Sequence, residues 1–170
     1  MNALTNNKHI LDWIDRCTAL TKPDEVVWID GSEEQLEGLR RIAVSTGEMI
    51  KLNEEKLPGC YLHRSDPNDV ARVEGRTFIC SRRKEDAGPT NNWMDPGEMK
   101  ELLRGIYDGS MKGRTMYVIP YSMGVIGSDF AKYGIELTDS IYVVLSMAIM
   151  TRIGQKVMDF LGDSEDFVKG

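Results

Sequence analysis

The first thirty residues combine helical spacing with a short apolar run. Apolar side chains within residues 10–20 recur three or four positions apart, which predicts an amphipathic helix. Pro23 follows that pattern and is expected to end the helix, because proline cannot continue the helical hydrogen bonding. Residues 26–29, Val-Val-Trp-Ile, are continuously apolar and predict a short buried strand.

A second helix is expected directly after that strand. Ser32 is followed by two glutamates and by Gln35, which occupies the capping-box position relative to the serine hydroxyl. The helix should run to about residue 45 and stop near Gly47. A strand, a turn and a helix in this order indicate an α/β domain.

The middle of the chain has a less regular pattern. Residues 60–63 and 77–80 predict short strands, and the polar, charged residues 84–92 predict a loop. Asp95 before Pro96 is typical of a helix start. We expect this helix to bury an apolar stripe formed by Met99, Leu102, Leu103 and Ile106.

The last third predicts two longer strands and two helices. Residues 115–121 and 135–138 have strand character, Asp139-Ser140 is expected to cap a helix over 142–152, and a short helix follows over 157–161. The predicted fold is α/β (α+β-like), a mixed β-sheet flanked by helices. We expect one domain over residues 1–170, since a chain of this length can bury about 70% of its unfolded surface.

Composition and charge exclude several classes of protein. The net charge is −6 and the pI is near 5.0, which disfavours a nucleic-acid binder. The longest apolar run, Ile141–Met150, is too short to span a bilayer, so no membrane segment is expected. Three scattered cysteines favour a reducing compartment, and we expect a cytoplasmic, soluble protein. One basic island fits either a solvated loop or a local anion site: Arg72, Arg76, Arg82, Arg83 and Lys84.

Motifs for local chemistry are absent from the sequence. The patterns G-x-x-x-x-G-K-[ST] and G-x-G-x-x-G of phosphate and dinucleotide sites do not occur. The two histidines, His9 and His63, have no partner at metal-ligand spacing, and no nucleophile has an obvious base beside it. The residues alone therefore indicate an α/β domain with a candidate anion site.

Three long segments resemble the N-terminal domain of GTP-dependent phosphoenolpyruvate carboxykinase. They are residues 61–77, YLHRSDPNDVARVEGRT; residues 112–140, KGRTMYVIPYSMGVIGSDFAKYGIELTDS; and residues 142–154, YVVLSMAIMTRIG. The resemblance implies that fold and the conversion of oxaloacetate and GTP into phosphoenolpyruvate, GDP and carbon dioxide. It also implies GTP and a divalent metal, Mn²⁺ or Mg²⁺, as cofactors of the full-length family, neither of them held tightly by this chain.

The resemblance assigns one catalytic residue. Arg72 matches the family's mobile-loop arginine, which binds the carboxylate and phosphate of oxaloacetate or phosphoenolpyruvate, and Arg76 is expected to add positive potential. A guanidinium suits that role because it pairs with two oxygens at once. A surface ion pair of Arg72 with Asp69 or Glu74 is the alternative. Gly75 and Arg76 stand where animal members have Ser-Lys, so the dynamics of this loop are expected to differ.

The family's metal ligands, phosphate loop and guanine pocket have no counterpart before Gly170. The resemblance therefore predicts a substrate-binding N-terminal domain without the nucleotide-binding region, inactive by itself and either a cut-down form or a short natural protein. The faces that meet that region in the family would be exposed, which favours self-association. A non-catalytic binding, regulatory or assembly module on the same scaffold is the alternative function.

Overall fold

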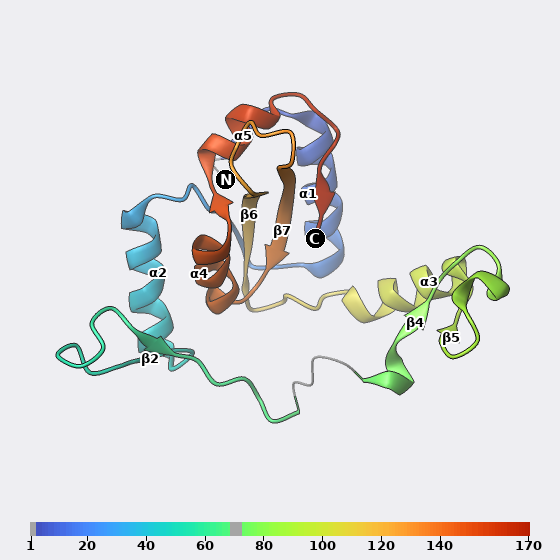
Figure 1. The fold of residues 1–170 in the computed structure, drawn as a ribbon, viewed down its shortest axis with the longest axis horizontal. Coiled ribbons are helices and arrows are strands. Elements are labelled where there is room, and N and C mark those ends of the chain that lie inside the picture. The colour runs from blue at the N-terminus through green and yellow to red at the C-terminus, as the bar shows by residue number, and fades with distance from the viewer. Residues whose placement is uncertain (1–2, 69–72) are drawn as a thin grey trace.

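The fold is built on one mixed sheet, seen in a computed structural model that describes residues 3–68 and 73–170 (Figure 1). Four strands follow one another across it in the order β1 (Glu25–Trp28), β6 (Thr115–Met123), β7 (Lys132–Thr138) and β9 (Val168–Lys169). A fifth strand, β8 (Arg152–Ile153), pairs with the end of β6. β1 is parallel to β6, β7 is antiparallel to β6, and β9 is parallel to β7.

Two helices cover each face of this sheet. On one face, α1 (Lys8–Thr21) and α5 (Gln155–Leu161) pack on Val118 and Ile135. On the other face, α2 (Glu33–Thr46) and α4 (Ile141–Met150) pack on Tyr117 and Ile119. Successive residues of β6 thus enter opposite halves of the core, as the two-residue period of a strand requires. The predicted α/β class, with a mixed sheet flanked by helices, is confirmed.

The helix boundaries follow from local capping. The Ser32 hydroxyl accepts a hydrogen bond from the backbone N–H of Gln35 (3.2 Å), and Gly47 ends α2 with φ at +80°. The capping box is only half formed, because the Gln35 side chain bonds instead to the carbonyl of Trp28 (2.8 Å) and the N–H of Asp30 (2.9 Å). It caps the end of β1, an edge strand, rather than its own helix.

The start of α4 differs from the prediction. Ser140 is the N-cap residue, but its side chain makes no capping hydrogen bond. Oε1 of Glu48, ninety-four residues before Tyr142, accepts from the backbone N–H of Tyr142 (2.9 Å) and from the Ser140 hydroxyl (2.8 Å). A carboxylate at a helix N-terminus is favourable because of the exposed N–H groups and the helix dipole.

Residues 47–114 form a long excursion between α2 and β6, which we call the arm segment. Its elements are β2 (Ile50–Lys51), β3 (Tyr61–Leu62), η1 (Glu74–Arg76), β4 (Phe78–Ile79), η2 (Lys84–Ala87), β5 (Asn92–Trp93) and α3 (Pro96–Tyr107). Figure 1 shows α3, β4 and β5 projecting to one side of the sheet. Within the described part of the arm segment, Ala87 is the single buried residue.

The prediction of a buried stripe on α3 is therefore wrong. Leu102 is 48% exposed and Ile106 is 62% exposed, and no residue of α3 is buried in the described structure. The helix itself is where the sequence placed it, with the Asp95 carboxylate accepting from the N–H of Gly97 (2.7 Å). In the described part of the chain, none of the helices combines the length and apolarity that crossing a bilayer requires.

Candidate functional site

The predicted substrate contact, Arg72, lies outside the described residues, as does Asp69. Its role stays a prediction. Arg76, the second predicted contact, is the last residue of η1, directly after the undescribed stretch, and it is exposed. The described part of the candidate site is therefore the backbone that follows Arg72 in the chain, residues 73–77.

The Asn92 side chain holds residues 74–77 in place. Its side-chain N–H group donates to the backbone carbonyls of Glu74 (2.9 Å) and Thr77 (3.2 Å), eighteen and fifteen residues away. The Thr77 hydroxyl in turn donates to the carbonyl of Val73 (2.8 Å). β4 pairs in parallel with β5 beside these contacts, with Phe78 opposite Asn92. The backbone on the C-terminal side of Arg72 is thus anchored to a two-stranded sheet.

A polar hollow opens beside η1. It has a volume of about 420 Å³ and is lined by Glu74, Thr77, Thr90, Asn91 and Asn92. The lining offers hydroxyl and amide groups that can hydrogen-bond to oxygen-rich ligands, together with one carboxylate. Positive charge for an anion would have to come from the neighbouring arginines, because the described lining contains neither Lys nor Arg.

The basic island of the sequence is not one uniform cluster. Arg83 forms a two-point ion pair with Asp86, with Nη2 to Oδ1 at 2.7 Å and Nε to Oδ2 at 3.1 Å. This hydrogen bonding raises the pKa of Arg83 above its ordinary value. Its charge is matched by Asp86, and the other exposed cations of the described island are Arg76, Arg82 and Lys84.

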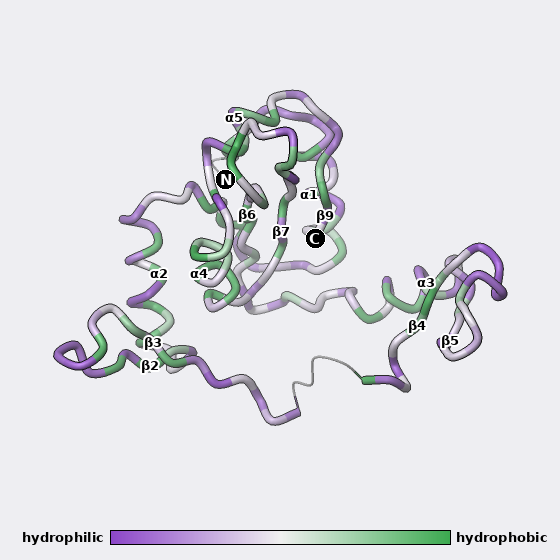
Figure 2. The backbone as a smooth tube through the Cα atoms, viewed as in Figure 1, coloured by the Kyte–Doolittle hydropathy of each residue, from purple (hydrophilic) through white to green (hydrophobic). Residues whose placement is uncertain are grey.

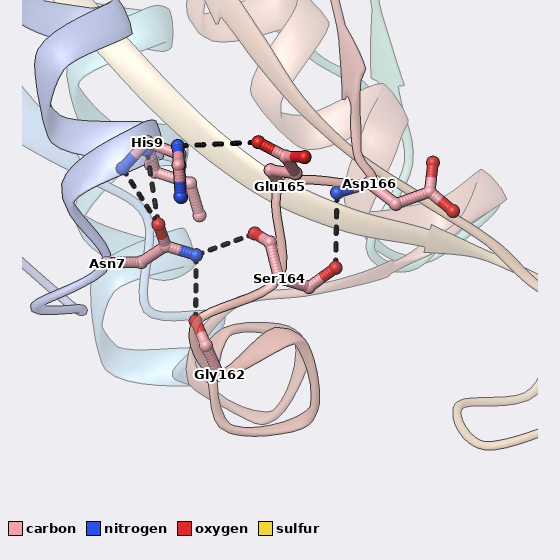
Figure 3. Close-up of polar contacts among 7 residues, drawn as sticks. Asn7, His9, Gly162, Ser164, Glu165 and Asp166 are labelled. Atoms are coloured by element: carbon pink, nitrogen blue, oxygen red, sulfur yellow. Dashed lines mark hydrogen bonds and ion pairs between the residues drawn. The ribbon is translucent and has the colours of Figure 1, made fainter.

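The histidines are engaged in contacts with the protein. His63 Nδ1 lies 2.7 Å from the carbonyl of Glu48, and its ring stacks on Tyr142 with centroids 4.0 Å apart. His9 Nδ1 lies 3.7 Å from Glu165 Oε2 (Figure 3). Among residues 3–68 and 73–170, no three His, Cys, Asp or Glu side chains come together as metal ligands. The described residues therefore do not fit a divalent metal.

Asn7 forms a buried polar junction that the sequence did not reveal (Figure 3). Its carbonyl oxygen accepts from the N–H of His9 (2.9 Å), and its amide group donates to the carbonyls of Gly162 (2.8 Å) and Ser164 (2.7 Å). The side chain is only 1% exposed. Asparagine before an amphipathic helix is a recognisable cap signal. The two carbonyls that accept from its amide group lie more than 150 residues away, so no local sequence pattern could reveal them. The junction joins α1 to the chain after α5 and has a structural role.

The chain matches the family model described as the phosphoenolpyruvate carboxykinase N-terminal domain over residues 12–170. A protein of Anaeromyxobacter dehalogenans named phosphoenolpyruvate carboxykinase (GTP) is 55% identical over 166 residues, which is 98% of this chain and 28% of the relative. Proteins of the same name from Corynebacterium kroppenstedtii and Corynebacterium jeikeium are 56% and 53% identical over 99% of this chain. The chain spans a little more than a quarter of the length of these relatives.

Proposed function

Because the chain belongs to the phosphoenolpyruvate carboxykinase N-terminal domain family, we propose that it acts as the N-terminal part of a GTP-dependent phosphoenolpyruvate carboxykinase. The observation that carries the proposal is 55% identity over 98% of the chain to a protein of that name. In this role the chain supplies contacts to oxaloacetate and phosphoenolpyruvate. The nucleotide and the divalent metal would be held by the part of the relatives' polypeptide that this chain does not match.

Arg72 is the proposed substrate contact. Its guanidinium can pair with two oxygens of a carboxylate or phosphate and stays charged at every physiological pH. Arg76, four residues later, adds positive potential beside it. The anchoring of Glu74 and Thr77 by Asn92 supports this assignment, because a substrate loop needs a fixed base from which to position its charged group.

The proposed reaction breaks the carbon–carbon bond to the departing carboxylate of oxaloacetate, releasing carbon dioxide and leaving an enolate. The enolate oxygen then bonds to the γ-phosphorus of GTP, and the bond from that phosphorus to the β–γ bridging oxygen breaks to give GDP. Such a transfer depends on positioning and on charge stabilisation. Arg72 contributes by holding the substrate's anionic groups. The chain alone is expected not to convert oxaloacetate into phosphoenolpyruvate.

Binding experiments on the chain test the substrate role. Phosphoenolpyruvate or oxalate is titrated up to millimolar concentration against the parent chain, Arg72→Ala and Arg83→Ala. Loss of a charge-assisted pair should weaken binding by about 10- to 100-fold in Arg72→Ala. Arg83→Ala is the matched control, since its guanidinium is already paired with Asp86. Equal affinities of the parent and Arg72→Ala would remove Arg72 from the site.

A turnover assay tests the second part of the proposal. The chain is incubated with oxaloacetate, GTP and Mn²⁺, and phosphoenolpyruvate formation is followed. We expect none above the level without protein. Appreciable turnover would show that the chain carries the whole catalytic machinery, and the division of labour proposed here would then be wrong.

A further inference from the structure

The chain around Arg72 has one described anchor on each side, at very different distances. On the N-terminal side, the ring of His63 stacks on Tyr142, and its Nδ1 lies 2.7 Å from the carbonyl of Glu48. Arg72 comes nine residues later, and nine extended residues span about 30 Å. On the C-terminal side, Glu74 follows Arg72 by only two residues, which span at most about 7 Å. The C-terminal anchor therefore restricts the position of Arg72 far more.

Residues 73–77 form a compact turn, which we call the 73–77 turn. The N–H of Arg76 donates to the carbonyl of Val73 (3.0 Å), and that of Thr77 donates to the carbonyl of Glu74 (3.2 Å). The Thr77 hydroxyl donates to the carbonyl of Val73 as well (2.8 Å). Because Val73 directly follows Arg72, the direction of this turn sets the direction from which the chain reaches that arginine.

The Asn92 side chain joins the 73–77 turn to β5. Its amide group donates to the carbonyls of both Glu74 and Thr77. Among residues 3–68 and 73–170, no other side chain from outside the turn hydrogen-bonds to it. Apolar packing contributes little, since Ala87 is the single buried residue of the described arm segment, and Figure 2 shows the chain between β4 and β5 as largely hydrophilic. Polar contacts therefore set the conformation of the turn.

We propose that Asn92 is a positioning residue for substrate binding, which acts by holding the 73–77 turn from which Arg72 is presented. The inference rests on the proposed function. An asparagine amide suits this role, because it offers two N–H donors without a charge that would change the field at an anion site. Without it, more of the backbone beside Arg72 would have to be ordered when the substrate binds, and that ordering weakens affinity.

Amide hydrogen exchange tests the anchoring without any ligand. In Asn92→Ala, we expect the amides of Arg76 and Thr77 to exchange several-fold faster than in the parent, because the turn that protects them opens more often. Asn53→Ala is the matched control. Asn53 is also an exposed asparagine of the arm segment, and its side-chain oxygen accepts from the N–H groups of residues 55 and 56 (3.0 Å each). That substitution should leave Arg76 and Thr77 unchanged.

A double-variant cycle tests whether Asn92 acts through Arg72. Phosphoenolpyruvate is titrated against the parent, Asn92→Ala, Arg72→Ala, the variant with both substitutions, and Asn53→Ala. We expect Asn92→Ala to weaken binding by about 3- to 10-fold in the parent, which is less than the loss in Arg72→Ala. In the Arg72→Ala background the same substitution should change binding by less than about twofold, since the group that it positions is gone. Asn53→Ala should bind like the parent.

The possible failures are distinguishable. Equal binding by the parent and Arg72→Ala would refute the proposed function and this inference with it. A clear loss in Arg72→Ala with none in Asn92→Ala would overturn the role of Asn92 alone. An equal loss from Asn92→Ala in both backgrounds would also overturn it, because Asn92 would then act on the fold or on the ligand directly. Unchanged exchange at Arg76 and Thr77 in Asn92→Ala would refute the anchoring itself.

Discussion

Gly154 lies where two backbone segments meet so closely that no side chain fits. Its φ is +97°, its N–H donates to the carbonyl of Pro120 (3.0 Å), and the next N–H donates to the carbonyl of Asp30 (3.1 Å). A Cβ added at Gly154 would lie 2.0 Å from that Asp30 oxygen and 2.7 Å from the nitrogen of Gly31. Gly154→Ala must therefore push apart the end of β1 and the start of α5.

Two contributions set the expected loss of stability. A left-handed conformation costs a non-glycine residue about 1–2 kcal/mol, and overpacking against an immobile backbone adds about 1–3 kcal/mol. Gly47→Ala is the control, because Gly47 has φ at +80° and ψ at 5° and nothing within 4 Å of an added Cβ. It should show the cost of a left-handed conformation alone, whereas Gly154, with ψ at −153°, adds overpacking and a backbone region that is essentially restricted to glycine. We expect Gly154→Ala to be less stable than Gly47→Ala by about 1–3 kcal/mol.

Urea unfolding followed by circular dichroism measures both variants against the parent. The slopes of the three transitions should agree, so that differences in midpoint report differences in the free energy of unfolding. Equal losses in Gly154→Ala and Gly47→Ala would refute the reasoning, since the close approach of Asp30 to Gly154 would then carry no energetic consequence.

Three further substitutions test other contacts by the same unfolding measurement. Asn7→Ala removes a helix cap and leaves two carbonyls without their donor, so we expect the free energy of unfolding to fall by about 2–4 kcal/mol. The exposed cap removed in Ser32→Ala should cost about 1 kcal/mol, and similar losses in the two variants would contradict a stabilising role of the buried junction. Glu48→Ala should cost about 1–2 kcal/mol through α4, and an unchanged midpoint would show that the cap at Tyr142 is dispensable. Burial raises the pKa of Glu136 above its usual 4.5, so the folded state binds the proton more tightly than the unfolded state does. The stability gained from this proton is fully present below the unfolded pKa and is lost as pH rises through the folded pKa. Glu136→Gln should therefore gain stability relative to the parent between about pH 4 and pH 7, and a constant difference across that range would exclude the effect.

The sequence predicted those parts of the fold whose causes are local. Ser32 and Asp95 cap their helices where the pattern placed them, and Gly47 ends α2, because each acts on neighbouring backbone groups. The two long strands followed from apolar runs in the same way. Glu48 as the cap of α4 and Asn7 as a two-sided junction were not predictable, since their partners lie far away in the chain.

The same division applies to the candidate site and the arm segment. The apolar spacing of α3 was read correctly as amphipathic, but periodicity cannot say whether a partner exists to bury the face, and Leu102 and Ile106 prove exposed. Asn92 belongs to no motif, so its hold on η1 emerged only from the structure. Arg72 came from the resemblance, lies outside the described residues, and its substrate role stays a prediction.

Because β1 pairs with β6, β1 cannot join the sheet until β6 has been synthesised. Trp28 lies opposite Val118, and the arm segment lies between them in the chain. At about 5–20 residues per second, roughly 5–18 s pass between the emergence of these two partners from a ribosome. During that interval α1 and β1 have no sheet to join, and the arm segment appears first with little core of its own. The nascent chain should therefore depend on chaperones until β6 is made.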